Sequence, residues 1–201
     1  MAPTSKNRPR LAVAHRADGG DTVSFDDLYE RFGGRVLNLA YRICGNADTA
    51  RDLAQDVWLK VYEKLATFEE RADAYTWIYR ITVNHVLNHL RRERRVRWFN
   101  LFDRDGGGTP EDTTDPAAAL PSGAAGADRA LETDERARRV WEAIQSLDPA
   151  YRTPLVLHHY EEMSYRQIAD TMDLSLAAVE ARIHRARKQL IRKLGPLLDQ
   201  L

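Results

Sequence analysis

The stretch SYRQIADTMDLSLAAVEARIHRARKQL, residues 164–190, decides the fold of the C-terminal part of this chain. Ser164 and Gln167 have the spacing of a capping box, which predicts that a helix begins after Ser164. Residues 173–175 (DLS) predict a short turn, and the basic segment that follows predicts a long helix ending near Leu194, before a Gly-Pro pair. A short helix, a tight turn and a longer basic helix have the proportions of a helix-turn-helix.

The basic helix of this segment offers one face to a polyanion. The residues expected to pack the two helices together are Ile168, Ala169, Met172, Leu174, Val179 and Ile183. The other face would enter the major groove, where arginine binds guanine bidentately and both arginine and lysine pair with phosphates. The residues expected to contact DNA are Arg182, His184, Arg185, Arg187 and Lys188. The alternative is an ordinary amphipathic hairpin, because a charge run is often only a solvated helix face.

Upstream of this segment, a helical pattern resumes near Leu131. The residues of this helix spaced for burial are Ala137, Val140, Trp141, Ile144 and Leu147. Asp148 followed by Pro149 predicts an N-cap with proline at the first helical position of the next helix. Pro154 lies further in and predicts a kink or a later start, because proline removes a backbone hydrogen bond.

The N-terminal half predicts a compact domain of three helices. Ser24 is placed as the N-cap of the first, which continues through the Gly-Gly pair at 33–34 and stops at Gly45. The apolar stripe of the second helix is Ala50, Leu53, Ala54, Val57, Trp58, Val61, Tyr62 and Leu65. The third is expected to begin near Asp73 and to run through TWIYRITVNHVLNHLRRERR.

The end of the third helix carries polar and aromatic side chains that suit an unstacked nucleic-acid strand. The polar members at helical spacing are Arg80, Asn84, Asn88, Arg91 and Arg92, and the basic run continues with Arg94 and Arg95. Tyr75, Trp77 and Tyr79 stand beside them. Aromatic side chains stack on unpaired bases, each stack contributing about 1 to 3 kcal/mol. Core packing is the alternative for Trp77, because its spacing to Ile78 and Ile81 is that of a buried stripe.

Formal net charge is zero, but the charges are strongly segregated along the chain. Residues 91–97 carry five arginines against one glutamate, and residues 182–193 carry six basic residues and no acid. Residues 103–135, between these two blocks, are acidic. Two basic blocks around an acidic spacer indicate two contacts with a polyanion.

These patterns predict an all-α protein with two small helical domains joined by a flexible linker. Residues 1–22 are expected to form a disordered tail, and residues 23–99 the first domain. Residues 100–130 are read as an acidic linker rich in Gly and Pro, and residues 131–196 as the helix-turn-helix domain. With no apolar run long enough to span a bilayer, the protein is expected to be cytoplasmic, without membrane insertion.

The sequence offers no catalytic set, so we expect no enzyme and no cofactor. Cys44 is the only cysteine, which excludes an intrachain disulfide. His85, His89 and Glu93 lie four apart and could form half of a metal site, but no further ligand pattern completes it, so no metal is predicted. The histidines at 158–159 point about 100 degrees apart on a helix, and no phosphate loop or nucleophile elbow occurs.

Taken together, these stretches resemble the extracytoplasmic-function (ECF) group of the sigma-70 family over residues 25–98 and 131–194. The matching motifs are FDDLYERFGGRVLNLAYRICGN, DTARDLAQDVWLKVY and YTWIYRITVNHVLNHLRR in region 2, and SLDPAYRTPLVLHHYEEMSYRQIADTM and VEARIHRARKQL in region 4. The resemblance implies a sigma factor that binds core RNA polymerase, recognises the −35 and −10 promoter elements and initiates transcription.

The resemblance also implies partners for individual residues. Asp52, Gln55 and Asp56 would dock on the clamp coiled coil of the largest polymerase subunit, and region 4 on the flap. The residues that would read and open the −10 element are Trp77, Arg80, Asn84, Asn88, Arg91, Arg92, Arg94 and Arg95. The −35 contacts would come from the five candidates on the basic helix, and an anti-sigma factor is a further expected partner.

The start of the recognition helix departs from the family. Members usually have Gly-Thr-Val-Lys there, where this chain has Ala177, Ala178, Val179 and Glu180. Ala178 offers no hydroxyl to a phosphate, and a phosphate would repel Glu180 unless it accepts from a cytosine amino group. Two alternatives therefore stay open: a helix-turn-helix regulator that acts without polymerase, and a sigma-like decoy that only binds an anti-sigma factor.

Overall fold

The computed structural model describes residues 24–66, 68, 73–102 and 127–198. Within these residues every regular element is a helix, which confirms the all-α prediction. The helices are α1 (Phe25–Cys44), α2 (Ala47–Leu65), α3 (Ala74–Phe102), α4 (Ala127–Gln145), α5 (Pro149–His159), α6 (Tyr165–Met172) and α7 (Leu176–Leu198). The predicted tail at residues 1–22 lies outside the described residues, as does most of the predicted linker.

The boundaries of α1 follow from its caps. The Ser24 side chain accepts a hydrogen bond from the Asp27 backbone N–H at 3.1 Å, as the N-cap prediction requires. At the other end Gly45 adopts φ +83°, the left-handed conformation that glycine allows without steric cost. A Cβ built on Gly45 would also lie 2.5 Å from the Gln145 side-chain oxygen. Gly45 is therefore required by its conformation, and a larger residue there would also displace the Gln145 side chain.

We expect Gly45→Ala to lower the free energy of unfolding by about 1 to 2 kcal/mol, because an L-residue is strained in the left-handed region. Urea denaturation followed by circular dichroism measures this. Gly34→Ala is the matched control: Gly34 lies inside α1 with open space around its Cβ position, so alanine should stabilise the protein by up to about 1 kcal/mol. A Gly45→Ala protein as stable as the wild type would contradict this account.

Helices α1, α2 and α3 pack against one another around a shared apolar core. The largest fully buried side chains of this bundle are Leu28, Val36, Leu39, Ile43, Val57, Val61, Ile78 and Tyr79. The predicted stripe of α2 is buried except at its end, where Tyr62 is 41 % exposed and Leu65 partly exposed. The bundle therefore leaves the outer faces of α2 and α3 free for contacts.

Helices α5 and α6 begin where the sequence predicts, whereas α4 begins at Ala127, four residues before the predicted start near Leu131. The Asp148 side chain accepts from the Ala150 backbone N–H at 2.9 Å, so α5 starts at Pro149 and includes Pro154. Both halves of the capping box between Ser164 and Gln167 are formed. Asp173 then takes a left-handed conformation, φ 55°, which closes the turn of the helix-turn-helix.

Three further details differ from the expectations. Helix α3 continues to Phe102, beyond the predicted segment, which ends at Arg95. Helix α7 runs through Pro196 to Leu198 rather than ending near Leu194. Ala137 is exposed and Val140 is 40 % exposed, although their spacing predicted burial. Helix α4 packs mainly on α7, so only a narrow stripe of α4 is covered.

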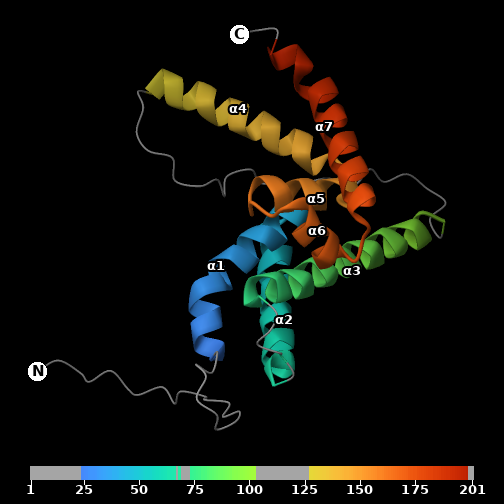
Figure 1. Cartoon of the computed structure of the whole chain (residues 1–201). Coiled ribbons are helices and arrows are strands. Elements are labelled where there is room, and N and C mark those ends of the chain that lie inside the picture. The colour runs from blue at the N-terminus through green and yellow to red at the C-terminus, as the bar shows by residue number, and fades with distance from the viewer. Residues whose placement is uncertain (1–23, 67, 69–72, 103–126, 199–201) are drawn as a thin grey trace, which may run out of the picture.

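The two halves of the chain pack on each other. Figure 1 shows α5 and α6 between the α1–α3 bundle and the pair formed by α4 and α7. Helix α6 contacts α3, and α5 contacts α1, α6 and α7. A single apolar cluster runs from the bundle into the helix-turn-helix, where it includes Leu157, Met163, Ile168, Val179 and Ile183. Regions 164–190 and 25–102 therefore share a core.

Candidate nucleic-acid interface

The outer face of α7 carries the basic side chains expected to meet DNA. His184, Arg185, Arg187 and Lys188 are exposed, and Arg182 is partly exposed. Val179, Ile183 and Ala186 are fully buried on the opposite side of the same helix. Because α7 is anchored by that buried side, its basic face is turned toward solvent, as an element that enters a groove requires.

The first turn of α7 is built differently from the rest of its outer face. The Ser175 hydroxyl accepts from the Ala178 backbone N–H at 3.2 Å and so caps the helix. Leu176 is 46 % exposed, and Ala177 and Glu180 are also exposed. This turn presents apolar groups and one carboxylate, which suit a thymine methyl and a cytosine amino group better than a phosphate.

The exposed side of α3 forms a second polar surface, which we call the α3 row. Its members are Arg80, Asn84, Asn88, Arg91, Arg92, Arg94 and Arg95, all exposed. The Asn88 side-chain oxygen accepts from the Arg91 guanidinium at 2.9 Å. Arg94 contacts region 4, with its guanidinium 3.3 Å from the Asp148 carboxylate. The rest of the row is open to a ligand.

The three aromatic side chains beside this row have different environments. Tyr79 is fully buried, so it belongs to the core and not to a stacking platform. Trp77 is partly buried against the core, and its ring centroid lies 4.6 Å from that of Phe68. Trp77 therefore takes part in the core, as its spacing suggested, while remaining partly exposed. Phe68 had no sequence signal beyond being an isolated aromatic residue.

The outer face of α2 is acidic. Asp52, Gln55 and Asp56 are exposed at helical spacing, opposite the buried Leu53, Ala54, Val57 and Trp58. The His85 Nε2 lies 3.1 Å from the Asp56 carboxylate. Burial, together with the nearby Lys60 ammonium, lowers the pKa of His85. The imidazole is therefore neutral near pH 7 and leaves the acidic charge of this face intact.

The remaining expectations concern metals and membranes. Among the described residues no group of three or more His, Cys, Asp or Glu is placed to hold a metal ion. His89 and Glu93 approach each other at 3.2 Å, while His85 turns to Asp56 instead. No described helix combines the length and apolar character needed to cross a bilayer.

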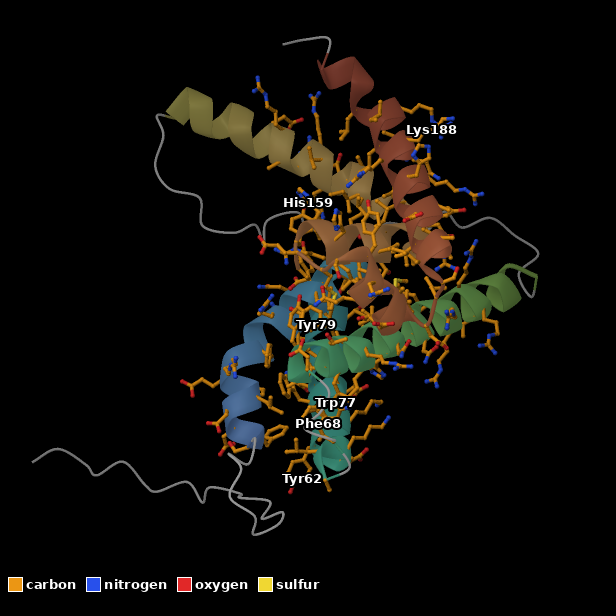
Figure 2. The ribbon with its side chains drawn as sticks, in the orientation of Figure 1. Tyr62, Phe68, Trp77, Tyr79, His159 and Lys188 are labelled. Carbon is orange, nitrogen blue, oxygen red and sulfur yellow. The ribbon has the colours of Figure 1, made fainter. Side chains whose placement is uncertain are left out.

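The surfaces just described lie in different places on the molecule. Figure 2 shows Lys188 on α7 at the opposite end from Trp77 and Phe68. Tyr79 lies between them, close to where the two halves of the chain meet. One polypeptide thus presents two separate cationic surfaces and one acidic helix face.

Family models match both halves of the chain. Sigma-70 region 2 matches residues 28–96, and Sigma-70, region 4 matches residues 137–190. The first match contains the α3 row and the acidic face of α2, and the second contains the helix-turn-helix.

Characterised proteins match over nearly the whole length. The RNA polymerase sigma-H factor of Pseudomonas aeruginosa is 34 % identical over 189 residues, covering 94 % of this chain and 95 % of that protein. The ECF RNA polymerase sigma factor SigW of Bacillus subtilis is 28 % identical, covering 89 % of this chain and 92 % of its own. The ECF RNA polymerase sigma-E factor of Escherichia coli K12 is also 28 % identical, with coverages of 92 % and 94 %.

Solved structures share the fold. The sigma factor RpoE in complex with the anti-sigma factor NepR from Bartonella quintana aligns with a TM-score of 0.63 at 21 % identity, over 85 % of this chain and 96 % of that one. CnrH in complex with the cytosolic domain of CnrY aligns with a TM-score of 0.54 at 23 % identity, over 88 % of both chains.

These matches confirm the predicted family and, because sigma factors are not enzymes, the predicted lack of catalytic activity. With regions 2 and 4 both present, the chain belongs to the extracytoplasmic-function group of the sigma-70 family, the factors that direct RNA polymerase to promoters.

Proposed function

We propose that this sigma factor docks on core RNA polymerase through the acidic face of α2 and reads a bipartite promoter with α7 and α3. The observation that carries the proposal is the placement of two anchored cationic surfaces in two different sigma regions. Asp52, Gln55 and Asp56 would pair with basic residues of the clamp coiled coil, and region 4 would rest on the flap. The proposed domains are residues 23–99 and 131–196, joined by residues 100–130.

Helix α7 would read the −35 element in duplex form. Its five basic candidates supply phosphate and guanine contacts, and its first turn supplies the less common contacts of Leu176, Ala177 and Glu180. We therefore expect the −35 sequence to favour a cytosine or thymine where the start of α7 meets the groove.

The α3 row would hold the opened −10 strand. Its arginines neutralise phosphates, and its two asparagines can bond the edges of unpaired bases. The partly exposed Trp77 ring, which packs on Phe68, would stack through its face on one base. No chemistry of the protein's own is needed, because binding energy for the separated strand favours opening.

The proposed function also implies a regulatory partner and a cellular location. An anti-sigma factor is a proposed partner, and the sigma factor RpoE, which shares the fold, was solved in complex with the anti-sigma factor NepR. A factor that serves RNA polymerase in this way would act in the cytoplasm.

Dependence on polymerase tests the proposal. A labelled promoter duplex should bind specifically when protein and core polymerase are present together. A helix-turn-helix regulator would bind the same duplex equally well without core polymerase. Equal binding in both conditions would therefore overturn the proposal, and so would specific binding in neither.

Exchanging Arg187 for alanine distinguishes phosphate contacts from base contacts on α7. If Arg187 pairs with a phosphate, binding to the −35 duplex weakens equally for all sequences, and the slope of log K against log salt falls by about 0.9. If it binds a base, sequence preference relaxes at one position instead. Arg166→Ala, an exposed position on α6, is the control. An Arg187→Ala protein with unchanged affinity, slope and preference would remove Arg187 from the interface.

A further inference from the structure

A buried carboxylate joins the two halves of the chain. Glu161 lies between α5 and α6 and is only 6 % exposed. The Arg35 and Arg42 guanidiniums of α1 each donate to its carboxylate at 3.3 Å, and the Tyr79 hydroxyl of α3 donates to it as well. The Tyr75 hydroxyl donates to the Glu161 backbone carbonyl at 2.7 Å. Every partner named here belongs to region 2, while Glu161 belongs to region 4.

Losing only some of the contacts of Glu161 would cost free energy. A carboxylate taken out of water needs charged or hydrogen-bonding partners, and removing one partner of a buried pair is strongly destabilising. Burial and the Glu161 carboxylate both raise the pKa of Tyr79, so its hydroxyl stays protonated and remains a donor. The contacts of Glu161 with region 2 therefore favour a single arrangement of the two regions, which we call the docked form, over arrangements in which the Glu161 carboxylate lacks these partners.

Further contacts join the two halves of the chain. The Arg42 guanidinium lies 4.4 Å from the centre of the Tyr160 ring, and the Gln145 side chain donates to the Arg42 carbonyl at 3.0 Å. Tyr41 and Trp141 stack with centroids 4.8 Å apart. Arg94, a proposed −10 contact, is held by Asp148. The docked form thus also occupies one residue of the α3 row.

When region 4 packs on region 2 in this way, the two DNA-binding surfaces lie closer together than the −35 and −10 elements that the proposed function requires them to contact. Elements at −35 and −10 are about 25 base pairs apart, or about 85 Å at 3.4 Å per base pair. Along α3, Arg95 lies about 24 Å from Tyr79, and along α7, Lys188 lies about 18 Å from Leu176. Since α6 packs on α3 and α7 packs on α5 and α6, these segments fold back on one another. The two DNA surfaces are therefore held well within 85 Å.

We propose that Glu161 is a latch that holds this sigma factor in a closed form, which must open before both promoter elements are engaged. The inference rests on the proposed bipartite function. In the closed form α7 remains accessible, so a −35 duplex alone still binds, while simultaneous contact with the −10 strand requires the Glu161 contacts to break.

Distances between labels on the two halves test the latch without DNA. Spin labels on Arg31→Cys in α1 and Arg166→Cys in α6, both exposed, report the separation in a Cys44→Ala background, because Arg31 lines the same cavity as Gln167, the neighbour of Arg166. The otherwise unchanged protein should give one short distance. Glu161→Gln removes the charge that both arginines bind, and the ratio of open to closed molecules should rise by about tenfold or more. Glu162→Gln, the exposed neighbour, should behave like the unchanged protein.

Tyr79→Phe provides a second variant that keeps the core volume and removes only one donor to Glu161. It should shift the distance in the same direction, with helicity by circular dichroism unchanged. Equal distance distributions in Glu161→Gln, Tyr79→Phe and Glu162→Gln would overturn the latch, as would a long distance in the unmutated protein.

The two proposals fail in different ways. If no template yields a transcript with core polymerase, the bipartite function fails, while the distance measurement still reports whether Glu161 closes the chain. If transcription proceeds and the Glu161→Gln distances do not move, the function stands and the latch is wrong.

Discussion

Exchanging both Asp52 and Asp56 for lysine is expected to lower the affinity for core RNA polymerase by about a hundredfold, since like charges facing each other cost several kcal/mol. Both carboxylates are exposed on α2, and its buried side is formed by other residues, so the fold should survive. Binding is measured by fluorescence anisotropy of labelled sigma factor titrated with core enzyme. Salt should weaken the wild-type complex but not the variant.

The matched control changes the same charge elsewhere. Asp170→Lys with Glu142→Lys reverses two exposed acids in region 4 and should leave the affinity within a fewfold of the wild type. Equal losses in the two double variants would indicate a general field effect and would contradict docking through α2.

Replacing Arg91, Arg92, Arg94 and Arg95 with glutamine should reduce binding of an opened −10 strand by on the order of a hundredfold at moderate salt. Each phosphate contact on single-stranded DNA contributes about 0.7 to the salt slope, so the slope should fall by about 3. All four side chains are exposed, and helix formation tolerates glutamine well. The measurement uses polymerase-bound sigma factor and a −10 fork template across a range of salt concentrations.

A −35 duplex serves as the control ligand, because α7 is unchanged in this variant. Its binding should be that of the wild type. If the variant lost −35 duplex binding to the same degree, or kept its salt slope on the fork template, the arginines would not be contacts of the −10 strand.

Local features of the fold follow directly from the sequence. The caps at Ser24, Asp148 and Ser164 depend on side chains within three residues of the groups they bond, so their spacing is visible in the sequence. The exposed position of the α7 cations follows in the same way from the apolar period of that helix. The two domains and their separate charged faces could therefore be predicted.

The contacts between the two domains could not be predicted from the sequence. Glu161 was visible only as an acid beside histidines and a tyrosine, and its partners lie 82 to 126 residues away in sequence. No periodicity links such distant positions. The pairing of Phe68 with Trp77 was hidden for a related reason, because Phe68 precedes the helix that carries its partner. Contacts made by packing of whole helices require the structure.

Run-off transcription with purified core polymerase tests the central claim most directly. The template is a library of genomic fragments, and the products are sequenced at their 5′ ends. We expect transcripts that depend on this protein and start at a fixed distance downstream of two shared short elements, lost in the Asp52→Lys/Asp56→Lys variant and in the arginine variant. Transcript levels equal to those of core polymerase alone on every template would contradict the assignment of a promoter-reading function.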